Sequence, residues 1–218
     1  MGYGIKIEAW GDWALFSRPE MKVERVSYDL ITPAAARGLI EAIYFKPAIK
    51  WYIDRIQICN PIKFTNIRRN EVKSKLLASN AKAAMEGKGT VNPIYTTSDI
   101  QQRASLLLKD VRYIIEAHFE LTEMAGESDT VEKHYNIALR RLRNGQCFHQ
   151  PYFGCREFPA SFKLYESEQE ERLNHENRDL GYMLYDMDFS DTNDIKPMFF
   201  RAVMKDGIID LKDCEVFR

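Results

Sequence analysis

The apolar positions of the chain repeat with two different periods, which divide it into strand-like and helix-like segments. Residues 4–10 and 110–121 alternate apolar and polar side chains, so that each has one apolar face, as in a half-buried strand. Residues 49–58 are dense in β-branched and aromatic residues, which also favour a strand. We therefore expect three strands in the first 121 residues.

The first predicted helix lies between two of these strands. Thr32 is suited to the N-cap, and Pro33 to the first helical position, where its missing N–H costs nothing. The segment runs through AAARGLIEAIYF and has to end before Pro47. A helix joining two strands is thereby predicted.

A second helix is predicted over 131–143, VEKHYNIALRRLR. Asp129 is a candidate N-cap with Glu132 three residues later, and Gly145 ends the segment. Its apolar stripe at helical spacing consists of Val131, Tyr135, Ala138, Leu139 and Leu142. Its first turn holds Lys133 and His134 side by side, and such an exposed pair is either an ordinary solvated face or a site for an anion.

The C-terminal third has a β-rich pattern. Residues 153–166 read as a loop followed by a strand, and 181–189 and 197–211 as short strands around an acidic connector. The Lys-Asp-Gly sequence at 205–207 signals a hairpin.

Residues 66–105 differ from the rest of the chain. They are polar and basic, with few large apolar side chains and with Gly-Lys-Gly and Asn-Pro breakers. A segment of this length inside a compact domain is usually functional or disordered. The sequence therefore predicts either a functional arm or a disordered surface loop.

The order of these elements is β-α-β, an insertion, β-α-β and a β-rich tail. It predicts an α+β fold: a ferredoxin-like (RRM-like) domain over 1–155 with a long basic insertion at 66–105. A small β-rich C-terminal subdomain follows at 156–218. This fold hosts many functions, so it does not decide the activity.

Composition narrows the class of protein. The chain has 218 residues, of which 45% are hydrophobic and 29% charged, as in a globular protein. No run reaches the roughly 18 apolar residues of a membrane span, and the N-terminus lacks the apolar core of a secretory signal. Four cysteines without a C-x-x-C pair predict reduced thiols and a cytoplasmic location. Cys147, His149 and Cys155 lack a fourth zinc ligand, so we expect no metal or other cofactor.

The formal net charge of −1 conceals an uneven distribution. Residues 63–82 carry six cations and only Glu71, residues 133–146 carry four cations and no acid, and residues 166–194 carry ten acids. This pattern suits a protein that binds phosphate on one face, although ordinary unevenness also produces it.

Four segments, 11–47, 109–121, 132–141 and 153–160, occur in an order and at a spacing that are specific together. They contain IYFKP, KDVRYIIEAHFEL, EKHYNIALRR and FGCREFPA. In these segments the chain resembles the Cas five proteins of type I-C (Dvulg-subtype) CRISPR systems, which belong to the RAMP superfamily. The resemblance covers nearly the whole chain.

The resemblance implies an endoribonuclease that cuts the repeat in precursor CRISPR RNA for antiviral defence. It also implies that the protein stays on the 5′ handle of the guide RNA in a Cascade-type complex with backbone and large subunits. The implied catalytic residues are Tyr44, Lys133 and His134. The glycine-rich loop of many RAMP proteins is reduced here to Asn144-Gly145 and Phe153-Gly154.

These residue types suit cleavage by the 2′-OH of RNA, which leaves a 2′,3′-cyclic phosphate without a metal. Histidine titrates near neutrality and can transfer protons, while lysine stabilises developing negative charge. A tyrosine hydroxyl can orient the phosphate or relay a proton. The first turn of a helix adds N–H groups that favour phosphate.

In the light of the resemblance we expect the basic insertion 66–105 to be an arm that grips the RNA handle or a neighbouring subunit. Other residues are candidates for contact with RNA. Those expected to bind it are Arg68, Arg69, Lys73, Lys75, Arg140, Arg141 and Arg156. The arginines of the second helix, Arg143 included, either contact phosphate or serve solubility. Glu116 and His118 share one face of a predicted strand, where they form a second acid–base pair or, as we favour, have a structural or RNA-contact role.

Two other functions fit parts of the sequence. One is a non-catalytic scaffold that only caps the guide RNA. The other is a metal-dependent DNase, with carboxylates of the acidic connector as Mg²⁺ ligands: Asp186, Asp188, Asp191 and Asp194.

Overall fold

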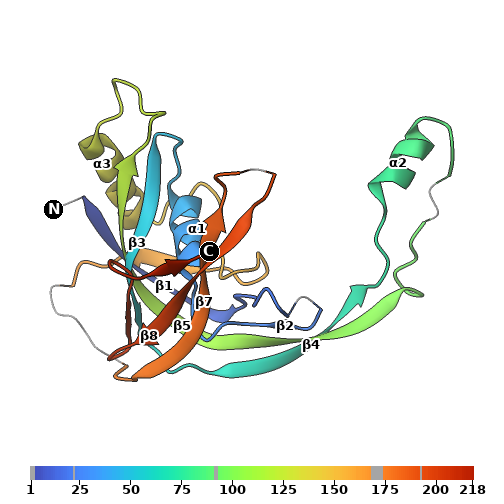
Figure 1. The fold of residues 1–218 in the computed structure, drawn as a ribbon, viewed down its shortest axis with the longest axis horizontal. Helices are drawn as coiled ribbons and strands as arrows, with labels where there is room; N and C mark the ends of the chain where they lie inside the picture. The colour runs from blue at the N-terminus through green and yellow to red at the C-terminus, as the bar shows by residue number, and fades with distance from the viewer. Residues whose placement is uncertain (1–2, 22, 91–92, 168–173, 192) are drawn as a thin grey trace.

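The computed structural model describes residues 3–21, 23–90, 93–167, 174–191 and 193–218. Its strands are β1 (Gly4–Ala14), β2 (Arg25–Val26), β3 (Ile49–Ile58), β4 (Phe64–Val72), β5 (Ile100–Leu121), β6 (Ser161–Leu164), β7 (Arg178–Asp188), β8 (Lys196–Met204), β9 (Ile208–Asp210) and β10 (Val216–Phe217). Its helices are α1 (Pro33–Ile43), α2 (Ala78–Met85) and α3 (Val131–Arg143). The chain is thus a mixed α and β protein (Figure 1).

Strand β5 organises the larger sheet, whose order is β6-β1-β5-β3-β9. The second half of β5 lies between β1 and β3 and pairs antiparallel with both. Its first half pairs antiparallel with β4 and parallel with β2. One strand of 22 residues therefore belongs both to the core and to a projecting ribbon (Figure 1).

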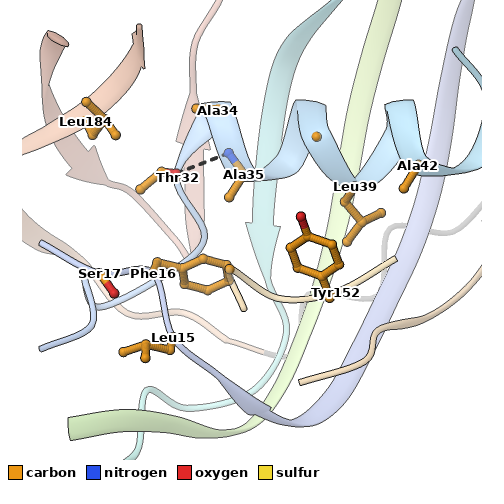
Figure 2. A pocket seen from close by; sticks show the side chains of 12 residues that line it. Leu15, Phe16, Ser17, Thr32, Ala34, Ala35, Leu39, Ala42, Tyr152 and Leu184 are labelled. Carbon is orange, nitrogen blue, oxygen red and sulfur yellow. Dashed lines mark hydrogen bonds between the residues drawn. The ribbon is translucent and has the colours of Figure 1, made fainter. Parts of the chain in front are cut away.

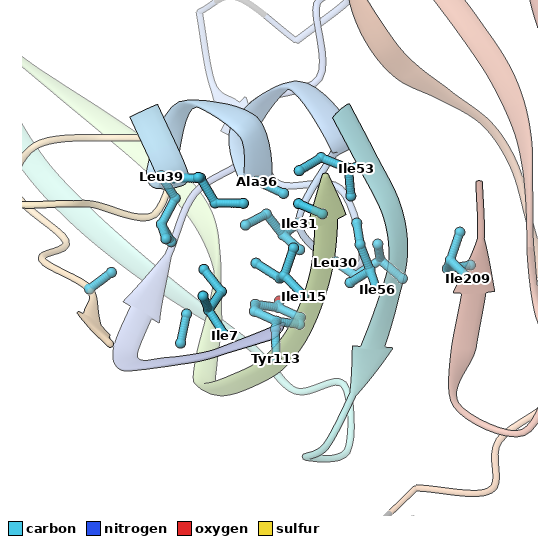
Figure 3. Packing of buried hydrophobic residues seen from close by; sticks show 14 of the residues in the cluster. Ile7, Leu30, Ile31, Ala36, Leu39, Ile53, Ile56, Tyr113, Ile115 and Ile209 are labelled. Atoms are coloured by element: carbon cyan, nitrogen blue, oxygen red, sulfur yellow. The ribbon is translucent and has the colours of Figure 1, made fainter. Parts of the chain in front are cut away.

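The core lies between this sheet and the helices. Alternate residues of the central strands, Ile7, Ile56 and Ile115, are completely buried. Leu39 of α1 packs into the same apolar cluster (Figure 3). The helix begins as predicted, because the Thr32 hydroxyl accepts a hydrogen bond from the Ala35 N–H at 3.2 Å.

The C-terminal strands divide between two sheets. Strands β7, β8 and β10 form a separate antiparallel sheet in the order β10-β8-β7, and β7 contacts α1. Strand β9 instead joins the larger sheet beside β3. Between β8 and β9, Asp206 and Gly207 have φ angles of 53° and 72°, as the tight hairpin predicted there requires. Among the described residues no helix is long and apolar enough to cross a membrane.

The described residues of the basic insertion form an arm with regular secondary structure. It consists of β4, α2 and the first half of β5, and it extends away from the body of the protein (Figure 1). The strand predicted over 110–121 is accordingly the second half of a longer one. The pattern misses this ribbon because five of the nine β4 residues are exposed, the other four are half-buried, and none is fully buried.

The loop 151–160 is fastened to the end of β1 by its backbone. The Leu15 N–H donates to the Phe153 carbonyl at 3.1 Å, and the Phe153 N–H donates to the Phe158 carbonyl at 2.8 Å. Gly154 has a φ of +79°, and a Cβ atom there would lie 1.9 Å from the Leu15 carbonyl oxygen. Gly154 is therefore required by backbone geometry.

We expect Gly154→Ala to destabilise the protein strongly. The left-handed backbone costs a non-glycine residue about 1–2 kcal/mol, and overpacking against Leu15 adds about 1–3 kcal/mol. Gly145→Ala is the matched control, because Gly145 has a φ of +61° but open space around it. Urea denaturation measures the two losses, and equal losses would contradict the role of the close approach.

Candidate active site

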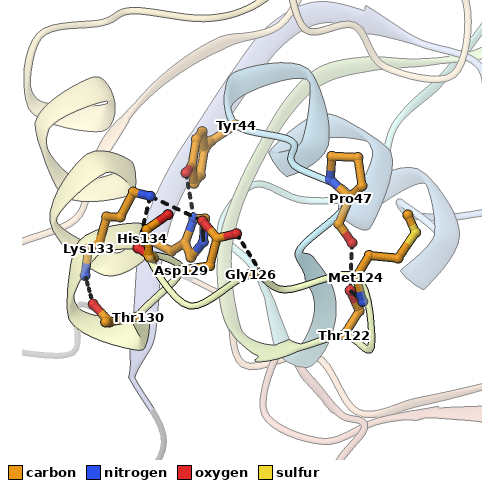
Figure 4. A network of polar contacts seen from close by, with 10 residues as sticks. Tyr44, Pro47, Thr122, Met124, Gly126, Asp129, Thr130, Lys133 and His134 are labelled. Atoms are coloured by element: carbon orange, nitrogen blue, oxygen red, sulfur yellow. Dashed lines mark hydrogen bonds and ion pairs between the residues drawn. The ribbon is translucent and has the colours of Figure 1, made fainter.

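The ends of two helices meet at a buried hydrogen bond. Tyr44, the C-cap of α1, has an extended backbone that turns its side chain toward α3. Its hydroxyl oxygen lies 2.7 Å from Nδ1 of His134 (Figure 4). The exposed fractions of the two residues are 1% and 2%. The two predicted catalytic residues, 90 positions apart in sequence, are thus in direct contact.

Neighbouring side chains hold Tyr44 in place. The indole N–H of Trp51 donates to the Tyr44 carbonyl at 3.0 Å. The Arg141 guanidinium lies 5.1 Å from the centre of the Tyr44 ring and donates to the Ile43 carbonyl at 2.6 Å. Arg141 therefore anchors the end of α1 from the neighbouring helix.

Burial determines the protonation state of Tyr44. Loss of solvent raises the pKa of its hydroxyl, and the Asp129 charge raises it further, while Arg141 opposes the shift. The hydroxyl therefore stays neutral near pH 7 and acts as a hydrogen-bonding partner of the imidazole.

Asp129 joins the two basic residues of the site. Its Oδ1 atom lies 3.1 Å from Nζ of Lys133 and 3.2 Å from Nε2 of His134. Adjacent residues of a helix point about 100° apart, yet both long side chains reach this one oxygen. Hydrogen bonds from the Gly126 N–H and from Lys133 lower the pKa of the Asp129 carboxyl, so it is charged at neutral pH.

The predicted N-cap at Asp129 is wrong. Thr130 occupies that position, and its hydroxyl accepts a hydrogen bond from the Lys133 N–H at 3.2 Å. The Asp129 carboxylate is one residue too early and instead accepts from the Gly126 N–H at 3.1 Å. Because Asp129 lies one residue before the cap, its other oxygen, Oδ1, can contact Lys133 and His134.

The two residues of the Lys-His pair have different surroundings. The Lys133 side chain is 45% exposed and also donates to the Ser128 carbonyl at 3.0 Å. The expected exposure is wrong for His134, which is buried with the apolar stripe of α3. Its Nε2 is close enough to Asp129 for an ion pair, but among the described residues it makes no hydrogen bond of good geometry. This nitrogen is the unsatisfied polar atom of the site.

The candidate RNA-binding residues fall into two groups. Exposed side chains on the arm or the surface are Arg68, Lys73, Lys75, Arg140 and Arg156. Arg69 forms an ion pair with Glu157 and donates to the Ser105 hydroxyl at 3.3 Å. Arg69 and Arg141 are therefore engaged within the protein.

Glu116 and His118 do not contact each other as an acid–base pair would. Nδ1 of His118 lies 2.9 Å from Asp54, and its ring stacks on Tyr52 with centroids 5.3 Å apart. Glu116 instead pairs with Lys6 at 3.1 Å.

The carboxylates of the acidic connector have separate partners. Asp186 pairs with Arg37 at 2.7 Å, and Asp194 with Lys196 at 2.8 Å. Over the described part of the chain, no three or more histidine, cysteine or acidic residues are grouped as metal ligands.

A separate cavity of about 430 Å³ lies beside α1 (Figure 2). Its walls are mainly apolar, and they include the small residues of α1 and Tyr152 of the loop 151–160. The residues that line it are Leu15, Phe16, Ser17, Thr32, Ala34, Ala35, Gly38, Leu39, Ala42, Tyr152, Gly154 and Leu184. Since none is a predicted catalytic residue, the cavity is distinct from the Tyr44–His134 site.

We expect Tyr44→Phe to lower the free energy of unfolding by about 1–3 kcal/mol, because it leaves Nδ1 of buried His134 without its partner. Chemical denaturation measures the change. Tyr95→Phe is the control, since Tyr95 is 68% exposed on the arm and its substitution should have little effect. An unchanged stability for Tyr44→Phe would show that the hydrogen bond contributes nothing.

Comparisons with known proteins agree on one family. The sequence model described as CRISPR-associated protein (Cas_Cas5) matches residues 4–212. The chain is 49% identical over 218 residues to a "CRISPR pre-crRNA endoribonuclease Cas5d" from Mannheimia succiniciproducens, covering 97% of this chain and 96% of the relative. It is 41% identical over 185 residues to the protein of the same name from Thermus thermophilus, covering 85% and 73%.

Solved structures show the same fold. A crystal structure described as a CRISPR-associated protein superposes with a TM-score of 0.69 at 23% identity, covering 99% of this chain and 96% of that one. A functionally uncharacterized protein from Streptococcus mutans gives the same score and identity, covering 99% and 97%. Together with the sequence matches, these findings place the chain: it belongs to the Cas5d family of CRISPR-associated proteins.

Proposed function

We propose that this protein is a metal-independent endoribonuclease that cuts the repeat of CRISPR precursor RNA. The names of its relatives support the substrate. The observation that carries the chemistry is the convergence of Tyr44, Lys133 and His134 at the first turn of α3. A neutral hydroxyl, an imidazole and an ammonium group are the residue types that cleavage by the 2′-OH needs.

In this mechanism the RNA supplies the nucleophile. The 2′-oxygen bonds to the adjacent phosphorus, its proton passes to a base, and the bond to the 5′-oxygen breaks as that oxygen gains a proton. His134 transfers protons through Nε2, while Tyr44 holds Nδ1 and fixes the ring. Lys133 stabilises the negative charge of the phosphorane. The products are a 2′,3′-cyclic phosphate and a 5′-hydroxyl.

We further propose that the protein stays on the 5′ handle of the guide RNA in a type I-C complex with backbone and large subunits. The exposed cations of the arm, Arg68, Lys73 and Lys75, support this role because they project beyond the body of the protein. Arg140 and Arg156 are also exposed and are further candidates for contact with RNA. Arg69 and Arg141 instead have partners within the protein, where they stabilise the fold. A non-catalytic scaffold would bind RNA through the same surface, but it would have no need for the buried Tyr44–His134 contact.

The finer fold assignment is also a proposal. We infer a ferredoxin-like domain because β1-α1-β3 and β5-α3-β6 are two β-α-β units whose strands interleave in the order β6-β1-β5-β3. The cytoplasmic location stays a prediction, supported by four free cysteines. The division near residue 155 also stays a prediction, and β6, the fourth strand of this order, begins after it at Ser161.

The decisive experiment incubates the purified protein with repeat RNA from its own CRISPR array in excess chelator. We expect cleavage at one position, with a 2′,3′-cyclic phosphate on one product and a 5′-hydroxyl on the other. Tight binding without cleavage would support the scaffold instead. Products with a 3′-hydroxyl and a 5′-phosphate would exclude attack by the 2′-OH.

We expect His134→Ala to slow cleavage at least about 100-fold while RNA affinity stays within about threefold, because the imidazole moves protons and is buried away from the surface. Lys133→Ala should lower both rate and affinity, because its ammonium also attracts phosphate. His175→Ala, on the surface, is the control. Equal losses of binding and cleavage in His134→Ala would assign the residue to recognition.

We expect the double variant Lys73→Gln/Lys75→Gln to weaken RNA binding and to reduce its dependence on salt. Each lost phosphate contact lowers the slope of log K against log salt by about 0.7 for single strands. Lys88→Gln is the matched arm control, because that ammonium already pairs with Glu86 at 2.9 Å. If the double variant and the unaltered protein had the same slope, these lysines would not contact the RNA phosphates.

A further inference from the structure

The two basic side chains of the proposed site, Lys133 and His134, already contact an anion, and that anion belongs to the protein. Oδ1 of Asp129 is within 3.2 Å of both Nζ of Lys133 and Nε2 of His134. A phosphate oxygen offers the same charge and the same acceptor lone pairs as a carboxylate oxygen. The two groups that the mechanism directs at phosphate therefore converge on a carboxylate instead.

The same contact closes the site. His134 is 2% exposed, with Tyr44 at one ring nitrogen and Asp129 at the other. RNA can reach Nε2 only after the Asp129 carboxylate leaves. Electrostatic repulsion points the same way, because a charged carboxylate and a phosphate cannot both lie between Lys133 and His134 without a large cost.

The segment that carries Asp129 lies on the surface, outside the apolar core. Residues 122–130 connect β5 to α3 and are mostly exposed. The start of the segment is held where the Thr122 hydroxyl donates to the Pro47 carbonyl at 2.6 Å (Figure 4). The end is held at the N-cap of α3. Between these anchors the Asp129 carboxylate accepts hydrogen bonds from the Gly126 N–H and from Lys133. Its displacement therefore breaks surface contacts and leaves the apolar core intact.

We propose that Asp129 Oδ1 occupies the subsite of the scissile phosphate in the free protein, and that incoming RNA displaces this carboxylate to open the site. The inference rests on the proposed function, because it assigns the phosphate subsite of the same reaction. It identifies Asp129 as a residue that competes with substrate, and it places the phosphate between Lys133 and His134.

The geometry disfavours the other role for Asp129, that of orienting His134 during catalysis. An orienting carboxylate accepts a hydrogen bond from the imidazole, as in catalytic triads. Here the contact with Nε2 has ion-pair distance without hydrogen-bond geometry. Tyr44 already orients the ring through Nδ1. With Asp129 as a second permanent partner, neither nitrogen would remain for the RNA.

The test compares Asp129→Asn and Asp129→Ala with the unaltered protein, using the repeat RNA and a 2′-O-methyl version that cannot be cut. Both variants should bind the uncut RNA about threefold to tenfold more tightly, because closure no longer competes with binding. Their single-turnover rates at saturating RNA should stay within about twofold. Glu127→Gln, which removes an exposed charge two residues away, should change neither value.

A second measurement needs no RNA. Carbethoxylation of histidines by diethylpyrocarbonate, followed by mass spectrometry, reports the access to each ring. His134 should react faster in Asp129→Ala than in the unaltered protein, while His118, which pairs with Asp54, reacts at the same rate in both. Thermal melting confirms that each variant is folded.

Three results would overturn the inference: RNA affinity that does not rise in either variant, a rate at saturating RNA that falls tenfold or more in both, or unchanged reactivity of His134. A tenfold fall of the rate in both variants would show that Asp129 is a positioning residue. If the unaltered protein binds repeat RNA but does not cut it, the proposed activity fails, and affinity and histidine reactivity still decide the role of Asp129.

Discussion

The site depends on one contact, the hydrogen bond between the Tyr44 hydroxyl and Nδ1 of His134. It joins the end of α1 to the start of α3, so the spacing of these helices on the sheet determines whether the site exists. That spacing comes from the apolar layer beneath them, where buried residues of β1, β3 and β5 set the positions of both helices. Hydrophobic packing thus specifies a polar contact between two residues that are 90 positions apart in the sequence.

The long strand β5 connects this site with the arm. Its second half supports the helices from below, and its first half pairs with β4 to form the ribbon that carries α2. A single continuous strand therefore relates the position of the exposed cations to that of the buried imidazole. In our proposal the arm holds the RNA while the first turn of α3 acts on it, which requires this fixed relation.

Much of the core could be predicted from sequence, because burial leaves a period in the apolar residues. The strand at 49–58 and the helix start at Thr32 are examples. The ribbon of the arm could not, since none of the β4 residues is fully buried. Tyr44 and His134 were identified by resemblance, whereas their contact depends on tertiary packing. Asp129 was assigned to the wrong role because capping preferences do not distinguish it from Thr130, although its i,i+4 spacing to Lys133 is an ion-pair signal.

The role of Asp129 follows from a general constraint on sites that bind anions. A buried imidazole nitrogen without a polar neighbour is costly, and the nearby Lys133 ammonium favours an anion at the same place. The Asp129 carboxylate satisfies that need at the point where the substrate charge will develop. In our proposal the carboxylate occupies the phosphate subsite before RNA arrives, and it can return when the phosphate leaves. In this proposal the burial of His134 belongs to the resting state of the cleavage site, before RNA binds.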